Sequence, residues 1–157
     1  MSLKSPPDIT VYDIADWFLA KAHSEGRYLK QMKLQKLVYF AYGWYYAFFD
    51  QSLFKESIFA WKHGPVVNDL YHKYKCFKKN PIMETGQQQD FCKSVESMLD
   101  YVWRTYEPYS DFFLSEITHR KESPWTQFYR KGELFSAIPS ESIRDYFKTL
   151  VSEYEYV

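Results

Sequence analysis

The stretch that decides the fold is residues 31–49, which read QMKLQKLVYFAYGWYYAFF. Its first turns are amphipathic, and its second half is apolar on every side. A helix of the second kind is buried on every side. The apolar run from Leu37 to Phe49 is interrupted only by Gly43, and it is shorter than the roughly 18 residues that a membrane-spanning helix needs. We therefore expect a central core helix over residues 31–49.

Helix-boundary signals occur on both sides of this stretch. Thr10 predicts a capped first helix that stops near Gly26. Ser110 predicts the start of a helix that runs to about Arg120, and Ser123, followed by proline, predicts a shorter one. Apolar residues at helical spacing predict two more helices, over 95–106 and 143–154. Short connections between such segments are typical of an α-helical domain.

The segment around the His63-Gly64-Pro65 turn is the exception to the helical pattern. Residues 57–61 read as a short extended segment, and 134–138 are a second candidate strand. Pro65 suits the first position of a third helix, with Gly64 in the turn before it. We expect a mainly α fold of six to seven helices with a small two-stranded β element.

Composition limits the classes of function. The 157 residues carry no net charge, so no global field attracts nucleic acid or an anionic membrane. The length suits one domain over 1–157, with a core over about 10–154 and a flexible start over 1–9. The start has no long apolar segment typical of a signal peptide. Cys76 and Cys92 read as reduced thiols, so we expect a cytoplasmic protein.

Motifs for catalysis and cofactors are absent from the sequence. No glycine-rich phosphate loop occurs, and the four histidines lack the spacing of zinc ligands. Ser115 and His119 stand four residues apart, where they could share a helical face and a hydrogen bond. Since no acidic partner completes a triad, we predict no catalytic residue, no metal and no cofactor.

Lys33 and Lys36 precede an aromatic run that contains Tyr39, Tyr42 and Trp44. Lysines beside aromatic rings occur on surfaces that bind single-stranded nucleic acid. The alternative is two solvated lysines at the start of an amphipathic helix. We favour the alternative, because no nucleic-acid-binding signature accompanies the pair.

Three segments in order carry a resemblance. They are KLQKLVYFA at 33–41, ESIFAWKHGPV at 56–66, and LSEITH at 114–119 followed by SPW at 123–125 and IPSESI at 138–143. This order is similar to that of the Panacea domain family, which includes SocA-like antitoxins and phage-associated proteins. The resemblance covers roughly residues 10–150.

The resemblance implies an antitoxin that neutralises a cognate toxin by protein contact, without metal or cofactor. It also implies a variant in which the antitoxin delivers its toxin to a cytoplasmic protease. Within the motifs, seven residues are candidates for partner binding: Lys33, Gln35, Lys36, Tyr39, His63, Thr118 and His119. Nine are expected to be structural: Leu34, Leu37, Trp61, Gly64, Pro65, Leu114, Ser115, Pro124 and Trp125.

Two alternatives stay open at this point. The first is a phage or host interaction protein with no toxin partner. The second is an enzyme that acts on nucleic acid through Lys33, Lys36, His63 and His119. Convergence of those four side chains in one pocket would favour the enzyme, and their separation would disfavour it.

Overall fold

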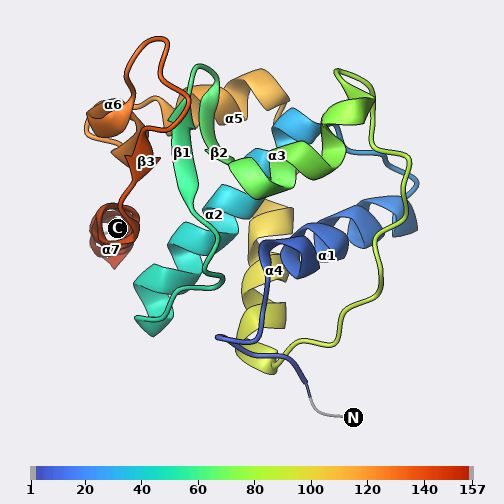
Figure 1. Cartoon of the computed structure of the whole chain (residues 1–157). Helices are drawn as coiled ribbons and strands as arrows, with labels where there is room; N and C mark the ends of the chain where they lie inside the picture. The colour runs from blue at the N-terminus through green and yellow to red at the C-terminus, as the bar shows by residue number, and fades with distance from the viewer. Residues whose placement is uncertain (1–2, 156–157) are drawn as a thin grey trace.

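The computed structural model describes residues 3–155, and over this range the chain forms seven α-helices and a three-stranded sheet. The mainly α fold of six to seven helices is therefore confirmed (Figure 1). No helix in the described range is long and apolar enough to cross a membrane. In chain order the elements are α1 (Val11–Ser24), α2 (Gln31–Phe49), β1 (Ile58–Trp61), β2 (Gly64–Val67), α3 (Asn68–Tyr74), a 3-10 helix η1 (Lys75–Phe77), α4 (Lys93–Tyr106), α5 (Asp111–Thr118), α6 (Pro124–Phe128), β3 (Ala137–Ile138) and α7 (Ser140–Glu155).

Local capping chemistry begins three of these helices where the sequence predicts it. The Thr10 side chain accepts a hydrogen bond from the backbone N–H of Asp13, whose carboxylate accepts one from the N–H of Thr10. The side chains of Ser110 and Ser123 cap α5 and α6, each by accepting a hydrogen bond from the backbone N–H three residues on. A cap satisfies a backbone donor that has no partner within the helix. These short-range bonds explain why the helix starts can be read from the chain.

Helix α2 is the centre of the domain and contacts α1, α4, α5, α7 and β2. Its predicted bounds are confirmed. Complete burial to its end is wrong, because the last turn reaches the edge of the domain and leaves Phe48 and Phe49 exposed. On α7, Ile143 and Phe147 are buried, whereas the side chain of Tyr154, predicted for the same face, lies outside the described part of the chain.

The sheet has the strand order β2-β1-β3, with both pairs antiparallel. It therefore has three strands rather than the expected two. The prediction that Pro65 starts a helix is wrong: Pro65 lies within β2, opposite Ala60, and α3 begins at Asn68. Proline is compatible with this place because β2 is an edge strand, where a missing N–H breaks no ladder bond.

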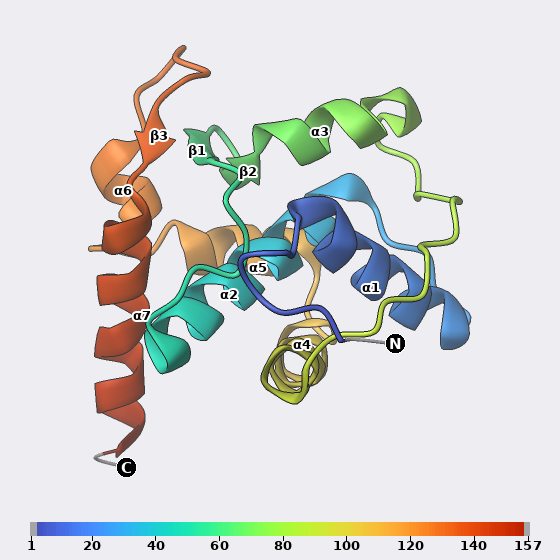
Figure 2. The same cartoon turned by 60° about the horizontal axis from the view of Figure 1, so that its bottom comes forward.

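The start of the chain is attached to the loop before α4. Lys4 and Phe91 form an isolated bridge, and the Pro6 carbonyl accepts a hydrogen bond from the Gln51 side chain. Ile9 is buried in the core. Figure 2 shows this segment passing between α1 and the start of α4.

Candidate functional site

Polar motif residues from α2, α5 and α6 converge on the hairpin formed by β1 and β2. Gln35 makes a two-way bond with Val67: its amide donates to the Val67 carbonyl (3.2 Å), and its carbonyl accepts from the Val67 N–H (2.9 Å). Both groups are buried. A buried edge strand thereby gains partners that the sheet does not supply. The role of Gln35 in the fold is to hold β2 against α2.

Lys36 lies beneath the same hairpin with only 1% of its surface exposed. Its ammonium donates to the Pro65 carbonyl at 3.5 Å. The aliphatic stem packs against Gly64, where an added Cβ would stand 2.6 Å from Lys36 Cε and 2.8 Å from Thr118 Oγ1. The idea that both motif lysines are solvated is therefore wrong for Lys36. Glycine is required at position 64, since its φ of 128° is unfavourable for other residues.

Helices α5 and α6 bind the outer side of the hairpin. Ser115 Oγ donates to the His63 carbonyl (2.5 Å), and Trp125 Nε1 donates to the Trp61 carbonyl (2.5 Å). Ser115 therefore pairs with the hairpin backbone and not with His119, which stacks on Trp125 with ring centroids 3.7 Å apart. Together with Gln35 and Lys36, these residues clamp both sides of the hairpin.

The four side chains of the enzyme hypothesis do not share one pocket. Burial lowers the pKa of His119, and the nearby charges of Lys36 and His63 lower it further, so these three groups lie near one another. Lys33 lies elsewhere and donates to the carbonyls of Glu107 and Tyr109, at the end of α4. The described residues contain no group of three metal-ligating side chains.

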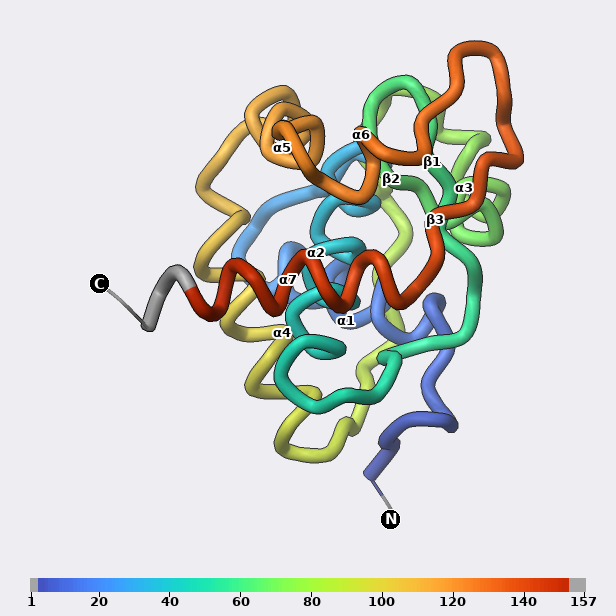
Figure 3. Tube along the Cα trace, turned by 90° about the vertical axis from the view of Figure 1, so that its left-hand side faces the viewer, coloured from blue at the N-terminus to red at the C-terminus, as the bar shows by residue number. Residues whose placement is uncertain are grey.

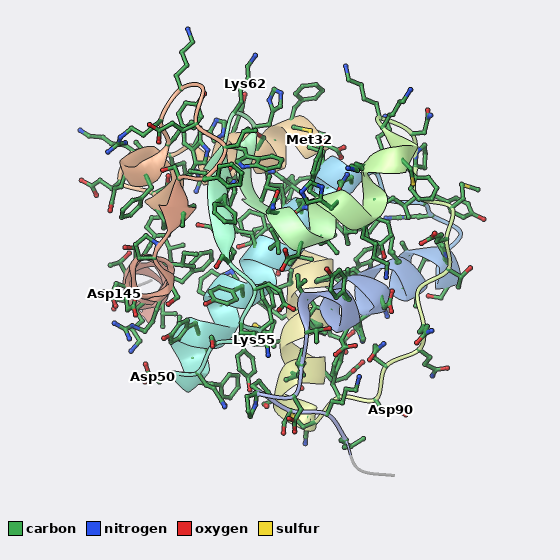
Figure 4. The ribbon with its side chains drawn as sticks, viewed as in Figure 1. Met32, Asp50, Lys55, Lys62, Asp90 and Asp145 are labelled. Carbon is green, nitrogen blue, oxygen red and sulfur yellow. The ribbon has the colours of Figure 1, made fainter. Side chains whose placement is uncertain are left out.

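The other motif residues divide between core and turn. Leu34, Leu37 and Leu114 are fully buried, and Pro124 opens α6 at a buried position. His63 is exposed beside Lys62, which Figure 4 shows at the outer end of the hairpin. Thr118 donates to the Ser115 carbonyl at 2.6 Å. Tyr39 and Thr118 both line an open groove.

Burial of the Lys36 ammonium predicts a stability that rises with pH in a defined window. Burial lowers its pKa from 10.5 to about 8, and the Asp111 charge opposes this only in part. Below about pH 8 the lysine is charged in both the folded and the unfolded chain, so burial of the charged ammonium lowers the stability of the folded state. Between about 8 and 10.5 the unfolded chain binds more protons, so the free energy of unfolding rises, by about 2 kcal/mol from pH 7 to pH 9.5.

The variant Lys36→Met is expected to abolish this rise. It is also expected to exceed the wild type in stability at pH 7 by about 1 to 2 kcal/mol, since a buried charge is replaced by an apolar chain of similar length. Urea unfolding at several pH values between 7 and 9.5 measures both effects. Lys33→Met is the matched control and should keep the rise. An unchanged rise in Lys36→Met would show that another group causes it.

A groove of about 420 Å³ lies beside the clamped hairpin, between α2, α4, α5 and α7. Figure 3 shows α7 running between α5 and α4 on this side of the molecule. The walls are largely aromatic, and Phe40 stacks on Tyr106 with ring centroids 3.9 Å apart. The lining residues are Tyr39, Phe40, Trp44, Thr105, Tyr106, Tyr109, Phe113, Ile117, Thr118, Arg120, Ser123, Tyr146, Phe147 and Leu150.

Apolar surface continues outward from the groove along the start of α5. Tyr109 and Phe113 line the groove, their rings contact each other in a tilted arrangement with centroids 4.8 Å apart, and both are exposed. Phe112 beside them is 77% exposed. Contiguous exposed aromatic surface marks interaction sites on soluble proteins. Sequence reasoning missed all three residues, because an exposed aromatic and a buried one look the same in a periodic pattern.

Comparison with known proteins adds one match. A family model described as "Antitoxin SocA-like, Panacea domain" matches residues 34–126, more than half of the chain. The matched segment contains the hairpin, its clamp and three of the four helices that border the groove. No curated protein and no solved structure matches.

Proposed function

We propose that this chain, which belongs to the family of SocA-like antitoxins with a Panacea domain, neutralises a cognate protein toxin by binding it, and that it catalyses no reaction. The family match over residues 34–126 is the observation that carries the proposal. It supports an antitoxin-type role and a protein partner. The same match makes a binding role more plausible than the enzyme alternative.

The aromatic groove and the exposed rings of Tyr109, Phe112 and Phe113 are the proposed docking surface. Binding energy at protein interfaces is concentrated in a few aromatic and arginine residues that pack into water-excluded pockets. The groove offers such a pocket, with exposed rings at its mouth. The hairpin clamp has a different part in this proposal: it positions α5, which carries Phe112 and Phe113.

A groove-filling variant tests this assignment. Thr105 lies on α4, is half-buried and lines the groove. In Thr105→Trp the new indole occupies groove volume, so toxin binding is expected to weaken by at least about tenfold. The measurement is growth of cells that produce the toxin from the adjacent reading frame together with this protein, followed by titration calorimetry of the purified pair.

Thr149→Trp is the matched control, because Thr149 is exposed on α7 and does not line the groove. It should neutralise the toxin as the wild type does. Full protection by Thr105→Trp would place the docking surface elsewhere. An adjacent gene product that is harmless alone, or that stays lethal beside the wild-type protein, would overturn the antitoxin role itself.

A second mode of action, delivery of the toxin to a protease, is favoured by a separate apolar patch. Leu134 and Phe135 are exposed, the latter by 78%. They lie in the loop before β3, which projects at the end of the molecule opposite the C-terminus (Figure 3). An adaptor needs one surface for its cargo and another for the protease. The half-life of the toxin in cells with and without this protein separates degradation from simple blocking.

A further inference from the structure

The wall of the groove contains a hydrogen-bond donor that has no acceptor. Tyr39 is only 2% exposed and lines the groove, and its hydroxyl finds no partner among residues 3–155. Burial, with the neighbouring phenols of Tyr146 and Tyr106, raises the pKa of Tyr39, so the phenol keeps its proton. A buried polar group without a partner costs about 1 to 3 kcal/mol. An occupant that supplies an acceptor would recover this cost.

A cation that lines the groove also forms no ion pair within residues 3–155. Arg120 is exposed, lines the groove, and forms no ion pair with any residue that the structure describes. Two other arginines do form ion pairs: Arg27 pairs with Glu107, and Arg144 pairs with Asp145. A guanidinium binds a carboxylate through parallel hydrogen bonds. The groove therefore combines apolar walls with a positive edge.

We propose that the groove receives an apolar-faced helix of the toxin that carries an acidic side chain, with Tyr39 donating to an acceptor of that helix and Arg120 pairing with its carboxylate. This inference rests on the proposed function and names the chemistry of the docking segment. A volume of about 420 Å³ suits a few side chains of a helix that lies in a groove, the mode in which residues at helical spacing act as anchors.

The acidic charge follows from complementarity with the protein itself. The Arg120 guanidinium donates hydrogen bonds and accepts none, whereas the Tyr39 hydroxyl, which keeps its proton, can donate one to an acceptor on the occupant. A basic docking segment would leave Arg120 unpaired and would bring a like charge to it. Such mismatches set specificity at interfaces, since an unpaired or repelled charge costs more than a neutral contact gains.

The test uses two probes: the purified protein encoded by the adjacent reading frame, and overlapping 20-residue synthetic peptides that cover its sequence. Two variants remove the proposed contacts, Tyr39→Phe and Arg120→Glu. Two matched controls are Tyr74→Phe, which changes a buried tyrosine outside the groove, and Lys121→Glu, which makes the same charge change on a neighbouring exposed residue that does not line it.

Tyr39→Phe is expected to weaken toxin binding by about fivefold without lowering the stability of the free protein, because the hydroxyl has no partner to lose. Arg120→Glu is expected to weaken it by at least about tenfold, and both controls should stay within about twofold. One peptide with apolar residues at helical spacing and an Asp or Glu should bind. Changing that acid to Lys should weaken binding to the wild type and restore it to Arg120→Glu.

Several results would overturn the inference and leave the antitoxin role standing. These are toxin affinity unchanged in both groove variants, binding only of basic peptides, or loss of self-association in Arg120→Glu, which would identify the occupant as a second copy of this chain. Failure of the wild-type protein to bind the toxin at all would instead overturn the proposed function. The two failures are thus distinguishable in one set of titrations.

Discussion

Replacing Gly64 with alanine is expected to lower the free energy of unfolding by about 3 to 5 kcal/mol. Two costs add. The φ of 128° at Gly64 is strained for any residue with a Cβ. The added methyl would also stand 2.6 Å from Lys36 Cε and 2.8 Å from Thr118 Oγ1, and crowding in a packed interior costs about 1 to 3 kcal/mol. Urea unfolding followed by tryptophan fluorescence measures the loss.

Gly132→Ala is the control that separates the two costs. Gly132 also has a positive φ, of 83°, but nothing lies within 4 Å of its added Cβ. Only the backbone strain remains there, so a loss of about 1 kcal/mol is expected. Equal losses at the two positions would mean that the close approach of Lys36 and Thr118 to the hairpin adds no crowding. A larger loss at Gly64 supports the clamp described above.

The second large effect is expected from Gly43→Ala, at the contact between α2 and α7. A Cβ at Gly43 would lie 2.2 to 2.5 Å from the ring carbons of Phe147. The gain in helix propensity, up to about 1 kcal/mol, is smaller than the cost of moving a buried ring. We expect a net loss of about 2 to 3 kcal/mol in the free energy of unfolding, measured by the same unfolding assay.

A double-mutant cycle with Phe147→Leu tests the cause. Leucine lacks the outer ring atoms that approach Gly43, so Gly43→Ala should cost much less in that background. Additive losses would mean that the ring of Phe147 is not what requires glycine. Because Phe147 also lines the groove, Gly43→Ala should weaken toxin binding as well, whereas a loss of stability without any change in binding would separate the α2–α7 contact from the docking surface.

Some features of the fold can be predicted from the sequence, and others depend on contacts between distant residues. The start of α1 and the bounds of α2 follow from short-range signals, namely the Thr10 cap and a continuous apolar run. The sequence predicts a helix start at Pro65, because the fixed φ of proline suits a helix start as well as an edge strand. Only the pairing of β2 with β1, and the bond from Gln35 to Val67, decide between them.

The sequence predicts which residues belong to the candidate site better than it predicts how they are arranged in space. Tyr39, Thr118 and Lys36 stood in the motifs that carry the family resemblance. Tyr39 and Thr118 line the groove together with residues from a distant part of the chain, Tyr146 and Leu150 on α7. A one-dimensional pattern shows which residues are apolar or polar, and it leaves open which of them face the same space.

The sequence by itself determined that residues 31–49 form a central helix, because an apolar run of that length has no stable place except a core. It also determined the family, because the family model matches residues 34–126. Only the tertiary structure decided that Lys36 is buried beneath a hairpin and that Tyr39 faces a groove. Burial and hydrogen-bond partners depend on residues more than 25 positions away in the chain, from Pro65 for Lys36 to Tyr146 for Tyr39.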